Sequence, residues 1–350
     1  MSLRKLYHWV DKTSKNWQGV TRHFRQNVVI FSRAVVLAQS SHLRALAGVA
    51  GGRADSQRRR LQRFVSRQQP LAAFFAGWTR SVLDVINQRL VVLVVDETKL
   101  LARWGVMVVG VAYGQRCIPL AWRIYRANSA ADYPREGQVE MILTLLRQVQ
   151  AGIPARCRVR VLADRGIGTS PRLMRGLMEL GWTFLFRVTK QSKVILPDGQ
   201  AVTFYQQVTQ PGSSYQASGQ VFKKRGRLSA HVRVLWAPDA QEPWALVTND
   251  PALTGWEYAQ RMWMEEAFRD LKSHGWQVED AALTDPQRMA HLWIFLVVAY
   301  GWMLLFGAQL AALGLTARPR RRADGSYVRR WSLFREGRQA FLTASFYSSA

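Results

Sequence analysis

The hydrophobic pattern of this chain is dominated by two continuous β-branched runs that each stop at an acid. Residues 89–96 end in Asp96, and residues 158–164 end in Asp164. Continuous rather than alternating apolar residues are typical of central strands that are covered on both faces. Each run therefore predicts a buried strand that holds a carboxylate rigidly at its end. An aspartate that only caps a helix or starts a turn is an equally good interpretation of either run alone.

The pattern between and after the two runs predicts an α/β fold. Alternating residues predict strands over 105–113 and 117–125, followed by a helix over 136–150. A glycine-containing loop and a helix capped near Ser170 follow Asp164, and a further strand is expected over 182–188. The resulting order places a mixed sheet between helices.

Residues 190–243 have a different hydrophobic pattern. Short alternating runs over 193–196, 201–206, 215–223 and 229–237 are separated by turns rich in proline, glycine, serine and aspartate. This segment predicts a small β-strand insertion. A strand over 243–250 then returns to the main sheet.

The segment 258–272 predicts an amphipathic helix with an unusual polar face. At about 100° per residue, one face carries a phenol, a guanidinium, a carboxylate and an ammonium, from Tyr258, Arg261, Glu265 and Lys272. Such a face suits phosphate groups and a hard cation. The ordinary alternative is a surface helix with an Arg261–Glu265 ion pair worth a few tenths of a kcal/mol.

The spacing Tyr258-x2-Arg261-x3-Glu265-x6-Lys272 resembles the YREK signature of bacterial transposases grouped with insertion sequence four. The resemblance covers roughly residues 40–312. It implies an RNase H-like core with a β-strand insertion between the second aspartate and the glutamate. It also implies that Asp96, Asp164 and Glu265 are the catalytic acids.

Three carboxylates without a histidine or cysteine ligand set favour Mg²⁺ or Mn²⁺. Two such ions per active site can support in-line displacement at phosphorus, with Asp96 as the shared ligand. Water would first release a 3′-OH at the element end, and this hydroxyl would attack the opposite strand or target DNA. The resemblance assigns Tyr258, Arg261 and Lys272 to DNA-phosphate binding and leaves a hairpin intermediate open.

The resemblance also places Trp244 where family members stack a tryptophan on a flipped base. Core packing is the alternative, because the chain has fourteen tryptophans. Arg187 and Lys190 are candidate DNA-phosphate contacts, and ordinary surface charge explains them equally well.

Charge points to a polyanionic partner. The chain has 49 Lys+Arg against 23 Asp+Glu, which gives a net charge of +26. An excess of this size favours nucleic acid. Near the N-terminus, helices predicted over 41–50 and 55–65 flank Gly51 and Gly52, which matches a helix-turn-helix plan. Candidate end-recognition residues on the second helix are Arg58, Arg59, Arg60 and Arg63, although many helical hairpins share this pattern.

The expected domains are a helical, basic DNA-end-binding domain over 1–80 and a core whose first part is 88–189. The β insertion over 190–243 comes next, then the second part of the core over 244–312 and a basic segment over 313–350. The arginine clusters at 318–322 and 329–330 fit either solvated loops that contact phosphates or a disordered tail.

Residues 292–310 form an apolar run long enough to span a bilayer. A helix buried in the core gives the same pattern and is favoured here, with a membrane protein as the alternative. The two cysteines lack metal-binding spacing and fit a reducing compartment, and no secretory signal is expected.

Together these features predict a bacterial, cytoplasmic, nucleoid-associated DNA transposase. Its partners would be double-stranded DNA, as terminal inverted repeats and target DNA, and a second copy of the chain in a homodimer that cuts in trans. The alternative is a catalytically inactive, transposase-derived DNA-binding protein.

Overall fold

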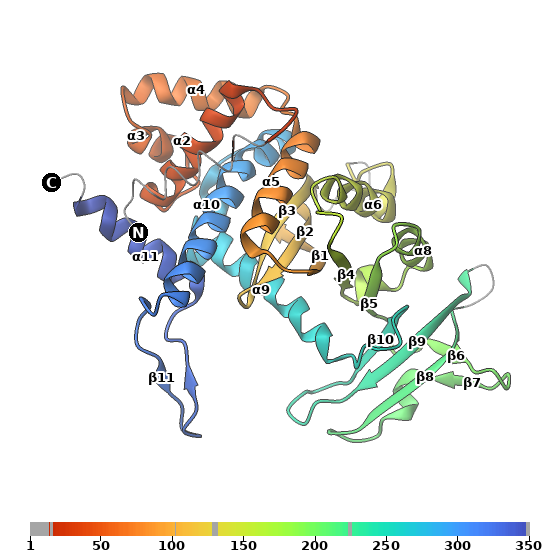
Figure 1. Ribbon diagram of the computed structural model, residues 1–350. Coiled ribbons are helices and arrows are strands. Elements are labelled where there is room, and N and C mark those ends of the chain that lie inside the picture. Colours follow the sequence, from red (N-terminus) through yellow and green to blue (C-terminus); the bar gives the residue numbers. More distant parts are fainter. Residues whose placement is uncertain (1–13, 15–16, 102, 128–131, 223–225, 348–350) are drawn as a thin grey trace.

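The computed structural model describes residues 14, 17–101, 103–127, 132–222 and 226–347. The first thirteen residues of the segment expected over 1–80 and the last three of that expected over 313–350 therefore lie outside the described residues. Within them, helices flank one large mixed sheet with strand order β3-β2-β1-β4-β5-β10-β9-β8-β6-β7 (Figure 1). This architecture agrees with the predicted α/β class and is consistent with an RNase H-like core.

Six strands form the half of the sheet that carries the candidate acids. In chain order they are β1 (Leu90–Leu100), β2 (Trp104–Tyr113), β3 (Arg116–Arg126), β4 (Arg158–Ala163), β5 (Thr183–Arg187) and β10 (Trp244–Thr248). The first three form an antiparallel meander, whereas β4 is parallel to both β1 and β5. The central strands of this half of the sheet, β1 and β4, are largely buried, as their continuous apolar runs predict.

Four further strands extend the same sheet beyond β10. They are β6 (Lys193–Ile195), β7 (Ala201–Thr203), β8 (Ser214–Val221) and β9 (Leu228–Leu235). The strand expected over 201–206 is shorter than predicted, because a 3-10 helix, η1 (Phe204–Gln207), follows Thr203. This turn buries Phe204 and lets the Tyr205 hydroxyl donate to the carbonyl oxygen of Pro243 at 2.5 Å.

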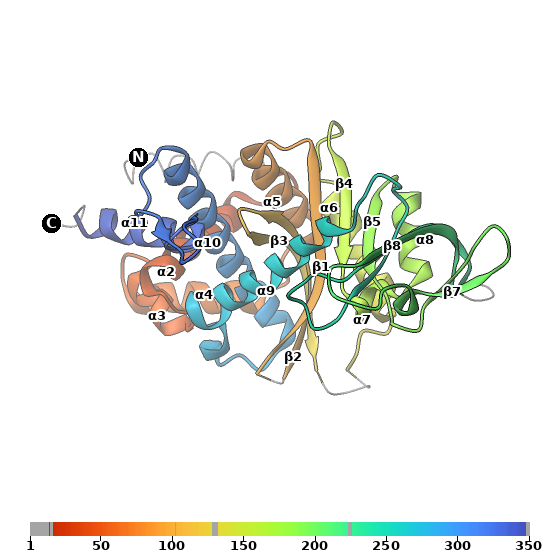
Figure 2. The ribbon, with the colours of Figure 1, turned by 90° about the horizontal axis from the view of Figure 1, so that it is seen from below.

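Helices connect and cover the sheet. Between β3 and β5 lie α6 (Gly137–Gln150), α7 (Arg165–Gly168) and α8 (Pro171–Glu179), and Ser170 caps α8 as expected. The segment of Tyr258 runs along β1, β2 and β3 as successive helical turns, which cross the middle of the view from below (Figure 2).

The N-terminal part is helical, with α2 (Arg22–Ala38), α3 (Leu43–Val49), α4 (Ala54–Ser66) and α5 (Leu71–Ile86). The N-cap of α4 is Arg53, and Asp55 lies in the first turn, where it pairs with Arg58 at 3.6 Å. A negative charge in the first turn stabilises the helix by interacting with its dipole, although Asp55 does not cap it.

The apolar run 292–310 lies in α10 (Pro286–Ala312), which Asp285 caps. Among the described residues, α10 is the one helix long and apolar enough to cross a membrane, and 83% of its apolar window is buried inside the protein. It packs against β3, α2 and α4, and the rings of Phe31 and Phe64 contact Phe295. The run therefore forms the shared core of the sheet and the N-terminal helices.

The C-terminal segment is more structured than its composition suggested. A short hairpin of β11 (Arg320–Arg321) and β12 (Tyr327–Val328) precedes helix α11 (Leu333–Tyr347). A Cβ added at Gly307 of α10 would lie 1.8 Å from the carbonyl oxygen of Leu333, and one at Gly337 would lie 1.9 Å from that of Met303. The two glycines thus let α10 and α11 touch backbone to backbone.

His291 gives this core a pH dependence. Its Nδ1 donates to the carbonyl oxygen of Val65 at the end of α4 (2.8 Å), while its buried Nε2 has no hydrogen-bond partner among the described residues. Burial lowers the pKa of His291 below its ordinary value. Protonation at Nε2 would bury an unpartnered charge, so the folded state favours the neutral ring.

We expect the free energy of unfolding to fall as the pH drops below about 6.5, the pKa of an unfolded histidine, because the unfolded chain then binds the proton first. His291→Leu should flatten this part of the profile. Thermal unfolding of both proteins between pH 7.5 and pH 5.5 measures it, with the exposed His42→Leu as the control. Parallel profiles for wild type and His291→Leu would contradict the assignment.

Candidate active site

The helical segment around Glu265 changes geometry twice. It begins as a 3-10 helix, η3 (Trp256–Arg261), continues as α9 (Met262–Arg269) and ends as a π-helix, η4 (Asp270–His274). The expectation of one regular helix with four polar residues on one face is therefore wrong. A 3-10 turn rotates each residue further, and a π turn less, than an α-helix does, so the four side chains diverge.

Asp96 and Asp164 are brought together by strand register. The parallel pairing of β1 with β4 ends at Val95 and Ala163, so the two aspartates are the next residues on neighbouring strands. The prediction that the first strand ends at Asp96 is wrong, because β2 keeps pairing with β1 as far as Leu100. Asp164 does end its strand and caps α7, where its Oδ1 accepts from the amide of Ile167 (3.1 Å).

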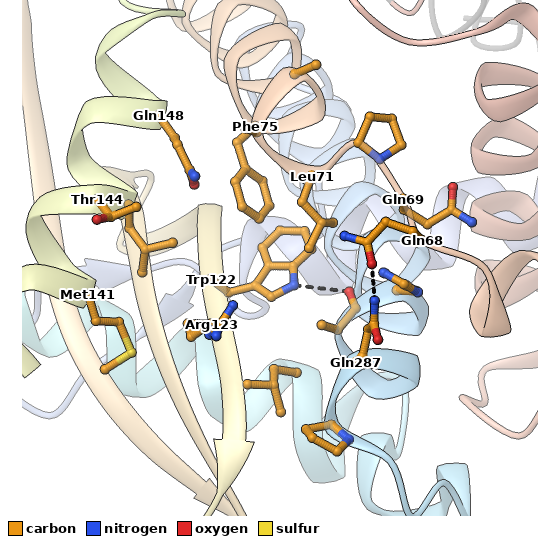
Figure 3. Close-up of a pocket in the computed structure, with 18 of the residues that line it drawn as sticks. Gln68, Gln69, Leu71, Phe75, Trp122, Arg123, Met141, Thr144, Gln148 and Gln287 are labelled. Atoms are coloured by element: carbon orange, nitrogen blue, oxygen red, sulfur yellow. Dashed lines mark hydrogen bonds between the residues drawn. The ribbon is translucent and has the colours of Figure 1, made fainter. Parts of the chain in front are cut away.

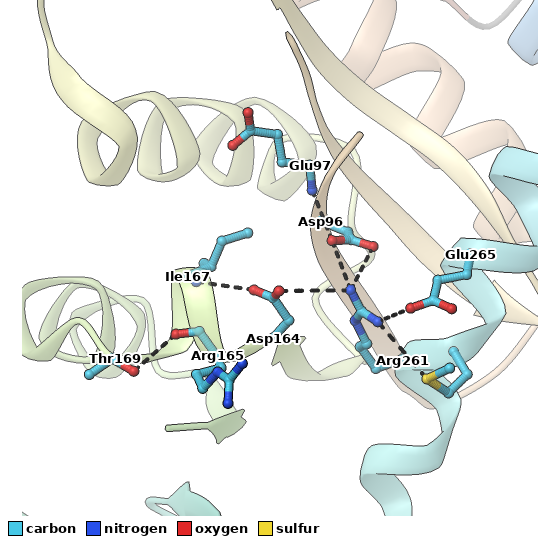
Figure 4. A network of polar contacts seen from close by, with 9 residues as sticks. Asp96, Glu97, Asp164, Arg165, Ile167, Thr169, Arg261 and Glu265 are labelled. Atoms are coloured by element: carbon cyan, nitrogen blue, oxygen red, sulfur yellow. Dashed lines mark hydrogen bonds and ion pairs between the residues drawn. The ribbon is translucent and has the colours of Figure 1, made fainter. Parts of the chain in front are cut away.

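The guanidinium of Arg261 lies among the three acids (Figure 4). Its Nη2 lies 3.0 Å from both carboxylate oxygens of Asp96 and 3.9 Å from Oδ2 of Asp164. Its Nη1 forms an ion pair with Glu265, one helical turn away. Three acids that are distant in the sequence thus converge on one cation.

Burial sets the electrostatics of this cluster. Asp96 is 5% exposed, and its burial, with a further contribution from the charge of Asp164, raises its pKa to about 6 although Arg261 opposes the shift. The Asp164 and Glu265 side chains are more open, at 37% and 39%. Of the three acids, the charged form of Asp96 is therefore the one that a nearby positive charge stabilises most.

The oxygen atoms that this cluster offers to a metal ion all belong to carboxylates, which are the ligands that hard divalent cations prefer. Within the described ranges, no three histidine, cysteine or acidic side chains stand close enough together to hold an ion. The guanidinium of Arg261 lies where the three carboxylates converge. The donor chemistry fits Mg²⁺ or Mn²⁺, and binding requires that guanidinium to move.

Lys272 and Tyr258 do not join the ion cluster. The Lys272 ammonium donates to Thr98 Oγ1 (2.9 Å) and to the carbonyl oxygen of Lys99 (2.7 Å), and so holds the last turn against the end of β1. Tyr258 is 3% exposed, and burial raises the pKa of its phenol. Its ring packs edge-on against Trp244, with centroids 5.2 Å apart.

Trp244 lies half-buried at the start of β10, between Tyr258 and Trp256. Trp256 is half exposed, with its ring 6.2 Å from that of Trp244. An aromatic cluster thus continues from the acid cluster to the surface.

Arg187 and Lys190 share one carboxylate that sequence reasoning missed. Lys190 Nζ lies 2.8 Å from Glu242 Oε2, and Arg187 pairs with Glu242 Oε1. Lys190 also lies over the ring of Tyr205. Glu242 precedes Pro243 and Trp244 in the sequence, and only the return of β10 to β5 brings it to these cations.

Acids next to the cluster have other partners. Glu97 follows Asp96 but points away from it and accepts from the Tyr125 hydroxyl. Asp270 binds Arg116 at 2.7 Å, and Glu266 pairs with Arg269 at 2.8 Å. These side chains support the fold around the cluster.

The arginines of α4 lie in the N-terminal helices. Arg58, Arg59 and Arg63 are exposed, whereas Arg60 is half-buried and its Nε donates to Asn27 Oδ1 at 2.6 Å. Arg59 and Arg63 share a shallow surface with Ser56, Gln62 and Ser66, which we call the α4 surface.

A cavity of about 720 Å³ lies elsewhere (Figure 3). It is bordered by α5, β3, α6 and the start of α10, and Trp122 in its wall donates to the carbonyl oxygen of Ala290 at 3.1 Å. It contains none of the three acids.

Residues 133–302 match the family model of the transposase DDE domain. The match covers just under half of the chain and includes Asp164 and Glu265, whereas Asp96 precedes it. No curated protein matches the chain. The matched domain supports a DDE transposase, and with it a nuclease that acts on DNA.

Proposed function

We propose that this protein is a DDE transposase of the YREK group that cuts and joins DNA at insertion-sequence ends. The convergence of Asp96, Asp164 and Glu265 on one cation carries the proposal. These acids come from a strand interior, a helix cap and a separate helix. A polyanion-binding charge of +26 accompanies them.

Asp96, Asp164 and Glu265 would hold two Mg²⁺ or Mn²⁺ ions, which when bound supply charge neutralisation and an activated oxygen for in-line displacement. Asp96 is the buried member of the set and would be shared between them. Water would first attack the phosphodiester at the element end and break its bond to the 3′ oxygen, which releases a 3′-OH. Attack of this hydroxyl on the opposite strand would give a hairpin intermediate, and attack on target DNA would join the two.

Arg261 would exchange partners during binding. A guanidinium that leaves the carboxylates keeps its charge and offers paired donors to a phosphate. Tyr258 and Lys272 would stay in place while Arg261 moves. Tyr258 is buried beside Trp244, and Lys272 is bound to the end of β1. This arrangement supports phosphate binding by Arg261, with Tyr258 and Lys272 at the edges of the same DNA contact.

Trp244 is the proposed stacking residue for a flipped base. Stacking on an aromatic ring is worth roughly 1–3 kcal/mol per base. Trp256, whose ring contacts that of Trp244, extends the aromatic cluster to an exposed position. Arg187 and Lys190 could contact the adjacent phosphates if Glu242 released them.

The exposed arginines of α4 are proposed to recognise terminal inverted repeats, with a second chain of a homodimer supplying the active site in trans. The cytoplasm and the nucleoid are the matching location. A catalytically inactive, transposase-derived DNA-binding protein is the alternative, favoured by one observation: Arg261 already pairs with the acids.

The first prediction concerns Asp96. Asp96→Asn should bind end DNA with unchanged affinity but reduce Mg²⁺-dependent nicking by more than about 100-fold, since even outer-shell changes at metal sites cost 10–100-fold. Glu97→Gln is the matched control, because its amide oxygen can still accept from Tyr125. Nicking of a supercoiled plasmid that carries the flanking repeats measures both. Wild-type nicking by Asp96→Asn would remove it from the active site.

The second prediction concerns Arg261. Arg261→Gln should bind Mn²⁺ more tightly than wild type in the absence of DNA, because no internal cation then competes for the three carboxylates. Isothermal titration calorimetry measures this without any cleavage assay, and Arg269→Gln on the same helix is the control. Equal Mn²⁺ affinity in wild type and Arg261→Gln would support the inactive alternative.

The third prediction concerns the α4 surface. Arg59→Ala with Arg63→Ala should weaken end binding and lower the slope of log K against log salt by about two, since each lost phosphate contact removes about 0.9. Arg60→Ala should have a smaller effect, because Asn27 already binds its guanidinium. Filter binding at several salt concentrations compares them. A larger loss in Arg60→Ala would place DNA on the other side of α4.

A further inference from the structure

The hairpin between α10 and α11 concentrates unbalanced positive charge. Residues 316–332, which we call the arginine hairpin, contain six arginines and one acid. The arginines are Arg318, Arg320, Arg321, Arg322, Arg329 and Arg330, and all are exposed. Within the part of the chain that the structure describes, none of the six forms an ion pair within 4 Å.

The hairpin is a built structure rather than a loose tail. Arg320 pairs with Val328 and Arg321 with Tyr327 across the two strands. At the tip, the amide of Arg322 donates to the carbonyl oxygen of Ser326 (2.8 Å). Asp324 Oδ1 accepts from both the amide and the hydroxyl of Ser326, so the one acid of the hairpin is used in its turn.

The base of the hairpin is fastened to the core. The amide of Ala317 donates to Glu336, a carboxylate that is only 6% exposed. Arg335 stacks over the ring of Trp331 at 4.8 Å, and Leu333 is buried against α10. The strands beyond this base have no core of their own, and Tyr327 is 71% exposed.

Packing therefore does not explain the composition of the hairpin. A two-stranded hairpin is at best marginally stable alone, and six like charges on it repel one another. A polyanion would remove the repulsion, and arginine forks match phosphate oxygens. The major groove of duplex DNA also admits a two-stranded β-ribbon.

The position of the hairpin suits a second DNA contact. Figure 1 shows the hairpin and the strands β8 and β9 extending from the same side of the body, with α9 between them. The α4 surface lies at the opposite end of the molecule in this view. A duplex that crosses α9 would reach the hairpin without approaching α4.

We propose that the arginine hairpin is a DNA-binding arm that contacts the phosphates of duplex DNA beyond the segment held at the acid cluster. The contact is to the backbone and so is independent of sequence. It rests on the proposed function only in the choice of DNA as the polyanion.

The test compares two triple variants that lose the same charge. One is Arg320→Ser with Arg321→Ser and Arg322→Ser in the hairpin. The other is Arg147→Ser with Arg156→Ser and Arg158→Ser, exposed positions in α6 and near the start of β4. Fluorescence anisotropy with a duplex of about 40 base pairs of arbitrary sequence, in EDTA, gives the affinity between about 50 and 200 mM salt.

The hairpin variant should bind about tenfold or more weakly and lose about two to three from its salt slope, whereas the control should keep the wild-type slope. Equal losses in both variants, or none in the hairpin variant, would overturn the proposal. A loss seen on anionic vesicles but not on DNA would overturn it as well.

A single substitution gives an opposite expectation. Asp324→Asn keeps an oxygen that can accept from Ser326 and removes one negative charge, so it should tighten binding and raise the salt slope by up to about one. Weaker or unchanged binding would count against the hairpin even if the triple variant failed to fold.

Nicking by the wild-type protein is scored separately. If the wild-type protein nicks DNA but the substitutions in the arginine hairpin leave DNA binding unchanged, only this inference is removed. If those substitutions weaken DNA binding but the wild-type protein does not nick DNA, only the proposed enzymatic function is removed.

Discussion

The buried carboxylate of Asp96 is the constraint on which the candidate site depends. A strand that continues on both sides of Asp96 gives it no freedom to turn toward water, and burial raises its pKa to about 6. A nearby positive charge therefore stabilises the charged form of this carboxylate. Arg261 supplies this charge in the structure, and Asp164 and Glu265 share the same guanidinium.

This arrangement links charge balance to function. A guanidinium that pairs with carboxylates competes with a divalent cation for them, and guanidinium groups also match phosphate oxygens. In the proposed function, Arg261 would keep the acids together before DNA binds and hold the substrate afterwards. The neighbouring fixed groups, Lys272 on β1 and Tyr258 beside Trp244, leave Arg261 as the member of the signature that faces all three acids.

Helix α10 plays the corresponding role for the rest of the molecule. Its buried length contacts the N-terminal helices, β3 and α11, so it joins parts of the chain that carry separate basic surfaces. The glycine contacts pack α11, which follows the arginine hairpin, directly against α10. The α4 surface and the hairpin then lie at different ends of the molecule, as two separate contacts with one long polyanion require.

Much of the fold was open to sequence reasoning because local patterns determine it. The β-branched runs of β1 and β4, the meander after Asp96 and the cap of α8 all lie close to their predicted positions. The segment selected by the spacing of Tyr258, Arg261, Glu265 and Lys272 includes Arg261 and Glu265, which lie in the acid cluster. Periodicity, turn residues and motif spacing are properties of neighbouring residues, so the sequence carries them directly.

Only the tertiary structure decided what these side chains contact. The register of β1 against β4 puts Asp96 beside Asp164, and the change from 3-10 to α to π geometry turns Arg261 into the cluster and Lys272 out of it. Glu242 meets Arg187 and Lys190 only because β10 returns to β5. The C-terminal arginines form a hairpin because α11 packs on α10. Such contacts depend on strand register and helix packing between distant segments, which no local pattern encodes.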